Sequence, residues 1–596
     1  MDEFKVIIPA QQTRKATEFV NKEKAIAWAD ELPLTDANVL SSMLIGALKE
    51  INQSKLDIIK RFEVLEVMRP ITRTANENLE KSYLRTMLPM GPRAKAAFEY
   101  GRDILVEMAK AYLILVDDVI QSAHPVAMER LLPYALYHAI SYLGRLLVTH
   151  YVVYSPIPDG IWRELHRLYM LAIEHKKQSL VLKISRKRGD TRQRSIDQAY
   201  KRVILVAQSE PYHLMQGEVN TIYNLMEQWS SECKLMPFIP GDVPTNGLVI
   251  DVNEDIGAFH LLKEGGRPAP ANGWLFVCDE VRNIMNKKIR SFLAPATAAD
   301  KVKYSLGERL ERDMYFRLSD GWANRRERAH TRTDEREDRG VVVGLSAYHY
   351  VTSDGADFEP EAVEVKLKKK DAESGNLAGL ELVAEDDESW KVEKEIATVE
   401  SGVKRMRLSD FEDQKDAWED IHANQARHQA VMQDRQAEVA ATAYTEKTCT
   451  QLDKSLGGLK LFADAASGIA LKSGELLGLN YCEANKKIWR LASVRWVMGD
   501  NDGINFGIRF IADNAMPMAS RGTKGAGEGG EYIRVLVVSE TVQNKREFSL
   551  ITPAAVYDLD SVVMLNNGKE LRHVRLSHMI ETTNTFSRFR FEVVTE

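Results

Sequence analysis

The sequence predicts a multidomain α+β protein with an N-terminal all-α helical bundle or stack, a C-terminal antiparallel β-barrel and a further small β domain. Its 596 residues suffice for three or more domains with sizeable cores. Up to about residue 235, apolar side chains recur at the spacing of amphipathic helices. From about residue 440, short apolar runs alternate with turns rich in glycine, asparagine and aspartate, which indicates antiparallel strands.

The composition is that of an ordinary globular protein, with 44% hydrophobic and 28% charged residues. A net charge of −6 provides no overall attraction to nucleic acid or to an acidic membrane, so any anion site has to be local. The cysteines Cys233, Cys278, Cys449 and Cys482 form no C-x-x-C pair, which argues against a zinc site and a disulfide framework. No signal peptide or membrane span is recognisable, and we expect a cytoplasmic protein.

The N-terminal domain is expected to span residues 1–235. Leu40, Met43, Leu44, Ala47 and Leu48 recur at helical spacing. Further helical patterns cover 104–112, 128–148 and 200–229, and another helix starts near Ile161. Because proline and glycine are common only between these segments, we expect antiparallel helices joined by turns.

A basic run at 183–194, KISRKRGDTRQR, lies inside this helical domain. We interpret it as a solvated helix face or loop, which is what most charge runs are. A docking surface for an acidic partner is the alternative.

Residues 236–322 differ in character and are expected to form a small α+β connector. Prolines 237, 240 and 244 mark a linker, and β-like runs follow at 248–251 and 274–278. A helical pattern then covers 279–292, with Val281, Ile284, Met285 and Ile289 on one face.

A barrel is expected over residues 439–520. Within it, a polar turn at 453–458 is followed by apolar runs at 459–462, 476–479, 489–497 and 504–511. The turn contains Asp453, Ser455 and Gly458 in the spacing D-x-S-x-x-G. Aspartate and serine often do no more than cap such a turn, and that is the structural alternative to a binding role.

This stretch resembles the PilZ domain, a small bacterial β-barrel that binds cyclic di-GMP and carries the D-x-S-x-x-G signature. The resemblance implies that Asp453, Ser455 and Gly458 belong to a ligand site. These residue types suit guanine, because a carboxylate accepts hydrogen bonds from its N1 and N2 donors and a hydroxyl can donate or accept. An arginine fork matches the O6 and N7 acceptors, and two phosphates call for further cations.

The family's other signature, R-x-x-x-R, stands just before its first strand. Two overlapping copies occur here, Arg328 with Arg332 and Arg332 with Arg336, and a strand is predicted directly after them at 341–350. We therefore expect 323–351 to supply the arginines and the first barrel strand, with Arg332 and Arg336 binding cyclic di-GMP and Arg328 in reserve. A mixed-charge helix end with i,i+4 ion pairs is the alternative interpretation.

The chain departs from the family in the distance between the two signatures. Arg336 and Asp453 are 117 positions apart, which predicts an acidic and helical insertion at 352–438 between the first and second barrel strands. A long excursion from a hairpin is tolerable because the cost of loop closure grows slowly with length. The later pair Arg427 and Arg435 has the wrong spacing for the signature.

A second small β domain is expected at 521–596, after a glycine-rich segment at 520–531. Its predicted strands are 532–538, 548–551, 561–565, 571–576 and 586–594.

The sequence contains no H-E-x-x-H, no G-x-S-x-G and no metal-ligand spacing, so we expect neither an enzyme nor a cofactor or metal. The resemblance to multidomain PilZ receptors implies a cyclic di-GMP receptor in surface attachment or type IV pilus function. Its helical half would bind a protein partner, which could recruit it to the membrane or a cell pole. The alternatives are a PilZ-like scaffold without ligand and a nucleic-acid-binding protein. The negative net charge and the lack of aromatic residues among the basic runs argue against the last.

Overall fold

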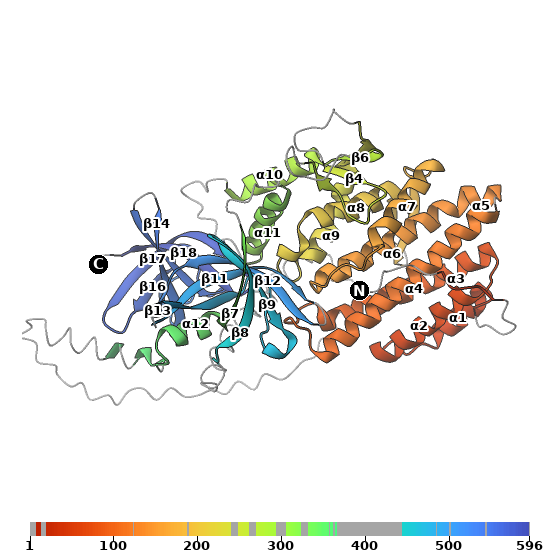
Figure 1. Ribbon diagram of the computed structural model, residues 1–596. Coiled ribbons are helices and arrows are strands. Elements are labelled where there is room, and N and C mark those ends of the chain that lie inside the picture. Colours follow the sequence, from red (N-terminus) through yellow and green to blue (C-terminus); the bar gives the residue numbers. More distant parts are fainter. Residues whose placement is uncertain are drawn as a thin grey trace, which may run out of the picture. The chain divides into compact units, whose positions relative to one another are not determined.

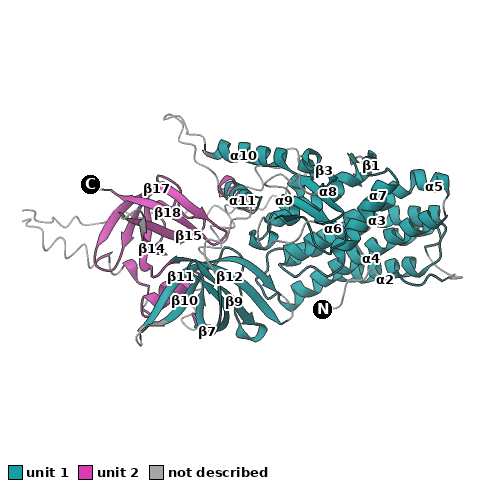
Figure 2. Ribbon diagram, turned by 45° about the horizontal axis from the view of Figure 1, so that its top comes forward, with its two compact units in different colours: residues 1–297, 311–343, 446–511 teal, residues 298–310, 344–445, 512–596 magenta. Residues whose placement is uncertain are grey.

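The structure is a computed structural model that describes residues 8–12, 19–122, 124–187, 190–239, 248–261, 270–293, 306–322, 332–356, 358–361, 364–365, 444–483, 486–499, 502–542 and 545–594. The chain divides into two compact units. The first comprises Met1–Thr297, Glu311–Val343 and Glu446–Ile511, and the second comprises Ala298–Leu310, Gly344–Thr445 and Ala512–Glu596 (Figure 2). The expected fold class, helical domain first and β-rich domains later, is confirmed.

The N-terminal part of the first unit is helical (Figure 1). Its long central helix α4 packs against α2, α3 and α6, and its residues from Ile104 to Val116 are mostly buried. The helices begin at capping side chains that the sequence provides: Asp36 caps α2, Asp57 caps α3, and Ser195 forms a capping box with Gln198 at α8. The helices are α1(Lys22–Asp30), α2(Ala37–Gln53), α3(Ile58–Tyr83), α4(Pro92–Ser122), α5(Pro125–Arg130), α6(Leu132–Val152), α7(Ile161–Glu174), α8(Ile196–Gln208) and α9(Glu218–Trp229), with 3-10 turns η1(Pro211–His213) and η2(Ser230–Glu232).

The basic run of the helical domain is neither a helix face nor a loop. It forms an antiparallel hairpin of β1(Leu182–Lys187) and β2(Asp190–Arg194). Leu182 and Ile184 are buried while Lys183 is exposed, which is the two-residue period of a strand with one face on the core. The charged residues obscured this alternation.

The connector forms a four-stranded antiparallel sheet in the order β3-β6-β4-β5, followed by two helices. Its elements are β3(Lys234–Pro237), β4(Leu248–Asp251), β5(Phe259–His260), β6(Gly273–Val277), α10(Asp279–Leu293) and α11(Leu306–Trp322). Val281, Met285 and Leu318 belong to the same apolar core as the helical domain. The connector therefore packs against the helical domain and is not a separate linker.

The first barrel closes in the strand order β10-β11-β12-β9-β8-β7. Its strands are β7(Thr333–Val343), β8(Lys447–Ser455), β9(Gly458–Asp464), β10(Leu476–Glu483), β11(Lys486–Gly499) and β12(Gly503–Ala512), with a 3-10 turn η3(Ala465–Ser467) after β9. The strand that follows the arginines, β7, pairs with β8 and β10, so strands on both sides of residues 352–438 belong to one barrel.

The boundaries predicted for this strand, 341–350, are wrong. The strand begins at Thr333 and ends at Val343, and Gly344 with φ of 95° leads directly into α12(Leu345–Thr352). A short apolar run does not distinguish a strand from a buried helix, and here Ala347 and Tyr348 are buried on a helix. Most of the insertion expected at 352–438 lies outside the described residues, as do Arg427 and Arg435.

The core of the first barrel is continuous with residues of the helical domain. Leu88 and Tyr154 lie in the same apolar cluster as the barrel residues Leu461 and Leu479. Two backbone contacts reinforce this junction: the amides of Leu88 and Leu471 each donate to the other's carbonyl at 3.0 and 2.9 Å, and the Gly499 amide donates to the Tyr154 carbonyl at 2.9 Å. We call Leu88, Tyr154, Leu471 and Gly499 the seam.

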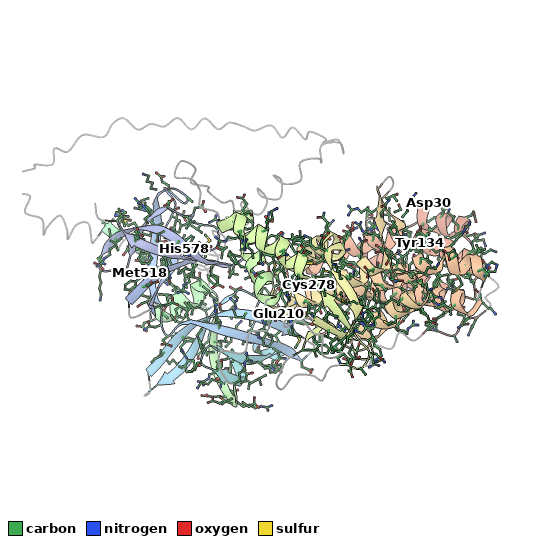
Figure 3. All side chains as sticks on the ribbon, turned by 90° about the horizontal axis from the view of Figure 1, so that it is seen from above. Asp30, Tyr134, Glu210, Cys278, Met518 and His578 are labelled. Carbon is green, nitrogen blue, oxygen red and sulfur yellow. The ribbon has the colours of Figure 1, made fainter. Side chains whose placement is uncertain are left out.

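The second unit contains another closed barrel, in the order β13-β14-β15-β18-β17-β16. Its strands are β13(Met516–Lys524), β14(Ile533–Val542), β15(Lys545–Pro553), β16(Val562–Asn566), β17(Leu571–Thr582) and β18(Phe586–Val593). Because β13 starts at Met516, the domain begins before the expected boundary at 521, and part of the glycine-rich segment is strand. Helix α12 packs on β13 and β14, where His349 Nε2 lies 3.1 Å from the carbonyl oxygen of Met518, a residue labelled in Figure 3.

Within the described ranges, no helix is long and apolar enough to cross a membrane. The same ranges contain no group of three or more histidine, cysteine, aspartate or glutamate side chains that could hold a metal ion.

We predict that His349 makes the second unit sensitive to acid. Burial, aided by Arg534, lowers the pKa of His349 to about 4, below the value of about 6.5 for an unfolded histidine. As pH falls, the unfolded chain therefore takes up the proton first, and stability is lost between about pH 6.5 and 4. His349→Gln, whose amide can still donate to Met518, should flatten the fall in unfolding temperature over this range. Equal slopes for both proteins would refute this role.

Candidate functional site

The polar turn of the first barrel is a two-residue hairpin between β8 and β9. Ser455 pairs with Gly458 across it, and the Ser455 hydroxyl donates to the Gly458 carbonyl at 3.0 Å. Gly458 also pairs with Arg509 of β12, and a Cβ at Gly458 would lie 1.9 Å from the Ile508 carbonyl oxygen. A larger residue would separate these strands, so Gly458 is required by close backbone approach rather than by a left-handed conformation.

Asp453 is held from two directions. Its Oδ1 accepts a hydrogen bond from the Lys460 amide at 3.1 Å, and its Oδ2 lies 2.8 Å from Nη1 of Arg332. The side chains of Asp453 and Arg332 are 14% and 37% exposed, so the pair lies at the surface and is open to a ligand. The structure thus joins one residue from each sequence signature, although they are 121 positions apart in the chain.

The strand register explains why Arg332 and Asp453 lie next to each other. β7 and β8 pair antiparallel, with Asp334 opposite Asp453 and Val341 opposite Lys447. The chain leaves β7 and re-enters β8 at the end that holds Val341 and Lys447. The signatures lie at the other end, so a long insertion leaves their geometry unchanged.

The two overlapping arginine pairs occupy different positions. Arg332 is the last residue before β7, as the first signature requires, whereas Arg336 lies within the strand. Arg336 is exposed in an irregular part of the β7–β8 register, between Asp334 and Glu337, and it forms no ion pair with any described residue. Arg328 lies outside the described residues.

Arg509 is a candidate that sequence reasoning missed. It is exposed and lies opposite Gly458 in the β9–β12 pairing, next to the hairpin. The residue stands in the G-I-R-F segment of β12, and the strand register shows that it lies near Asp453. Arg332, Arg336 and Arg509 therefore lie at positions of β7 and β12, or next to them, that flank the hairpin.

Two other arginines of the barrel have structural partners. Buried Arg339 donates from Nε to Gln451 Oε1 at 3.1 Å, and its guanidinium lies 4.6 Å from the Tyr481 ring centre. The guanidinium of Arg490 lies 4.0 Å from the Phe510 ring centre. These cation–π contacts stabilise one end of the barrel core.

The arrangement at the hairpin can bind an anion that carries flat polar rings. Arginine forks match phosphate oxygens or the O6/N7 edge of guanine. The carboxylate of Asp453 can accept hydrogen bonds from ring N–H groups.

Comparison with known proteins adds family information. Three family models match consecutive parts of the chain: the N-terminal domain of the cyclic-di-GMP receptor FimW at residues 23–240, its middle PilZ domain at 279–517 and its C-terminal β-barrel domain at 518–594. The chain is also 24% identical over 602 residues to the cyclic-di-GMP receptor FimW of Pseudomonas aeruginosa, which covers 99% of this chain and 93% of that protein. No solved structure matches.

The middle model includes both Arg332 and Asp453, so the PilZ resemblance noted in the sequence is confirmed. The boundary between the second and third models, 517/518, lies inside β13, close to the division between the two units.

Proposed function

Because the chain belongs to the family that the three FimW domain models describe, we propose that it is a receptor for cyclic di-GMP that binds the messenger on the first barrel. The observation that carries the proposal is the contact between Arg332 and Asp453, which unites the two sequence signatures at one exposed edge.

In the proposed complex, Asp453 and Ser455 hold a guanine edge while Arg332 and Arg336 bind phosphate or the O6/N7 edge. Arg328 is the reserve cation, and Arg509 is a further one that the strand register adds. The Arg332–Asp453 ion pair positions both side chains before the ligand arrives, which lowers the conformational cost of binding. Gly458 keeps the hairpin close to β12 so that Arg509 stays beside it.

We predict that Arg332→Ala weakens cyclic di-GMP binding. Loss of hydrogen bonds from a charged group costs roughly 1.5–3 kcal/mol, which is roughly ten- to a hundredfold in affinity. Arg332→Lys should not restore binding, because an ammonium cannot replace the planar fork. Asp453→Ala should have a similar effect, and its unfolding temperature should be measured alongside. Calorimetry with cyclic di-GMP, with GTP and cyclic AMP as specificity controls, measures these changes.

Arg572→Ala is the matched control, since Arg572 is an exposed arginine of the second barrel that is paired with Glu570. Its affinity should equal that of the wild type. If the wild type does not bind at high micromolar cyclic di-GMP, or if the Arg332, Arg336 and Asp453 variants all bind like it, the proposal fails. The ligand-free scaffold would then be the better description.

We also propose that binding is coupled to a protein partner through the helical half, in surface attachment or type IV pilus function. The seam supports the coupling, because it joins the barrel core to Leu88 and Tyr154 of the helical domain. A cytoplasmic location is part of the proposal, and the free, buried thiols of Cys233, Cys278 and Cys449 suit a reducing compartment.

Cross-linking of the full-length protein in cells, followed by mass spectrometry, tests where the partner binds. Lysine cross-links to a specific partner should come from the helical half, for example from Lys22, Lys24 or Lys60, and they should decrease in Arg332→Ala. Cross-links that come only from the two barrels would move the partner surface to the C-terminal half.

A further inference from the structure

The helical domain contains a polar cavity of about 470 Å³, far from the hairpin in sequence and assigned no role above. It is lined by residues of α3, α4, α6, α8, α9, β1 and β2. Among the described residues that line it are seven lysines and arginines but only three carboxylates, those of Glu77, Glu80 and Glu227. The protein as a whole is negatively charged, so this local excess of positive charge is a specific feature of the cavity.

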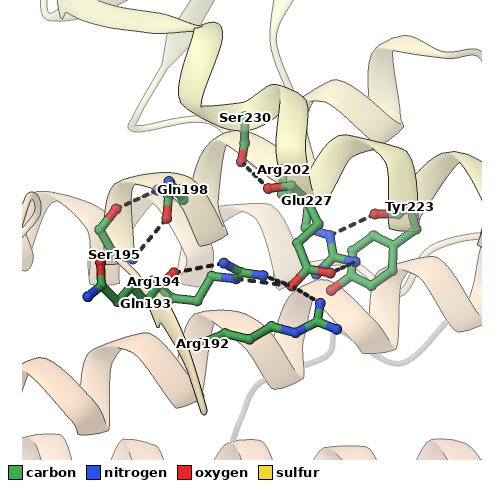
Figure 4. Close-up of polar contacts among 9 residues, drawn as sticks. All are labelled: Arg192, Gln193, Arg194, Ser195, Gln198, Arg202, Tyr223, Glu227 and Ser230. Carbon is green, nitrogen blue, oxygen red and sulfur yellow. Dashed lines mark hydrogen bonds and ion pairs between the residues drawn. The ribbon is translucent and has the colours of Figure 1, made fainter. Parts of the chain in front are cut away.

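The excess is concentrated around Glu227, a single carboxylate that contacts three guanidinium groups (Figure 4). Its Oε1 accepts hydrogen bonds from Arg194 Nε at 3.0 Å and from Arg192 Nη1 at 3.4 Å, and its Oε2 lies 3.8 Å from Arg202 Nη2. Burial alone would raise the pKa of Glu227, but these arginines outweigh it and hold the pKa below its usual range. One carboxylate neutralises one of the three positive charges.

The arginines are held in place by other contacts of the fold. Arg202 donates from Nε to the Tyr223 carbonyl at 2.8 Å, and its guanidinium lies 3.5 Å from the centre of the Tyr223 ring. On the opposite helix α6, Arg145 donates to Glu80 at 2.9 Å and to Asn220 at 3.1 Å. Such fixed arginines are preorganised, so little conformational entropy is lost when they bind an anion.

We propose that this cavity binds a phosphate-bearing small molecule of about nucleotide size. The arginines are partly buried, with side chains of Arg192, Arg194 and Arg202 that are 40%, 22% and 18% exposed. Guanidinium groups that are clustered, partly desolvated and directed at one cavity gain from an additional anion. Planar guanidinium forks favour phosphate oxygens, and the cavity volume lies in the range of small-molecule sites and exceeds the needs of a single phosphate.

The experiment is calorimetry of the full-length protein with pyrophosphate and with ATP, using adenosine as the uncharged control. Arg332→Ala serves as the background, so that the site proposed on the first barrel does not contribute. Pyrophosphate and ATP should bind and adenosine should not. Arg192→Gln should weaken binding by about tenfold. Arg167→Gln should have no effect, because Arg167 is a similarly exposed arginine of α7 that is paired with Glu164 and lies outside the cavity.

Glu227→Gln separates ligand binding from a purely structural role. Without its internal carboxylate, the cavity should bind pyrophosphate more tightly than the background protein does. The unfolding temperature should fall without pyrophosphate and rise more steeply with it. Absence of pyrophosphate and ATP binding would overturn the proposal. So would unchanged affinity in Arg192→Gln, or a Glu227→Gln protein that is destabilised but does not respond to pyrophosphate. None of these results depends on whether cyclic di-GMP binds the barrel.

Discussion

The antiparallel pairing of β7 with β8 is the contact on which the candidate site depends. It places Arg332, the last residue before β7, against Asp453 of β8 at 2.8 Å. The same pairing closes the barrel, because β7 is the strand that joins β8 to β10. Folding and ligand binding therefore share one requirement: a segment that precedes a long insertion has to return to the strand that follows it.

Two sites in the first unit follow the same electrostatic principle in different degrees. At the hairpin, Asp453 pairs with Arg332 at an exposed edge. In the helical cavity, Glu227 contacts three arginines that are partly buried. An exposed ion pair costs little to open, whereas partly buried cations are stabilised more strongly by a nearby anion. The hairpin site therefore suits a messenger that binds reversibly, and the helical cavity suits a ligand that stabilises the fold.

Much of the first site could be predicted from the sequence because its information is local. The spacing of Asp453, Ser455 and Gly458 and the apolar runs after them predict a hairpin and its strands. The start of β7 could not be predicted, since T-D-E-R-E-D is too polar for a strand on propensity alone and is stabilised by pairing with β8. Arg509 was missed for the same reason, because its place beside Gly458 depends on strand register.

The helical cavity could not be predicted from the sequence. The basic run at 183–194 was visible, but its interpretation as a solvated helix face or loop was wrong, because burial of Leu182 and Ile184 makes it a hairpin. Its arginines face Glu227 of α9, which lies more than thirty positions later in the chain. Tertiary contacts of this kind leave no periodic pattern.

Hydrogen exchange with and without cyclic di-GMP tests the central claim most directly, because it reports on the hairpin and the seam in one measurement. The account predicts slower exchange in peptides that cover 453–460, where the Lys460 amide donates to Asp453, together with a change at the amides of Leu88 and Leu471. Both effects should disappear in Arg332→Ala. Exchange at 453–460 that is identical with and without saturating ligand would contradict the account.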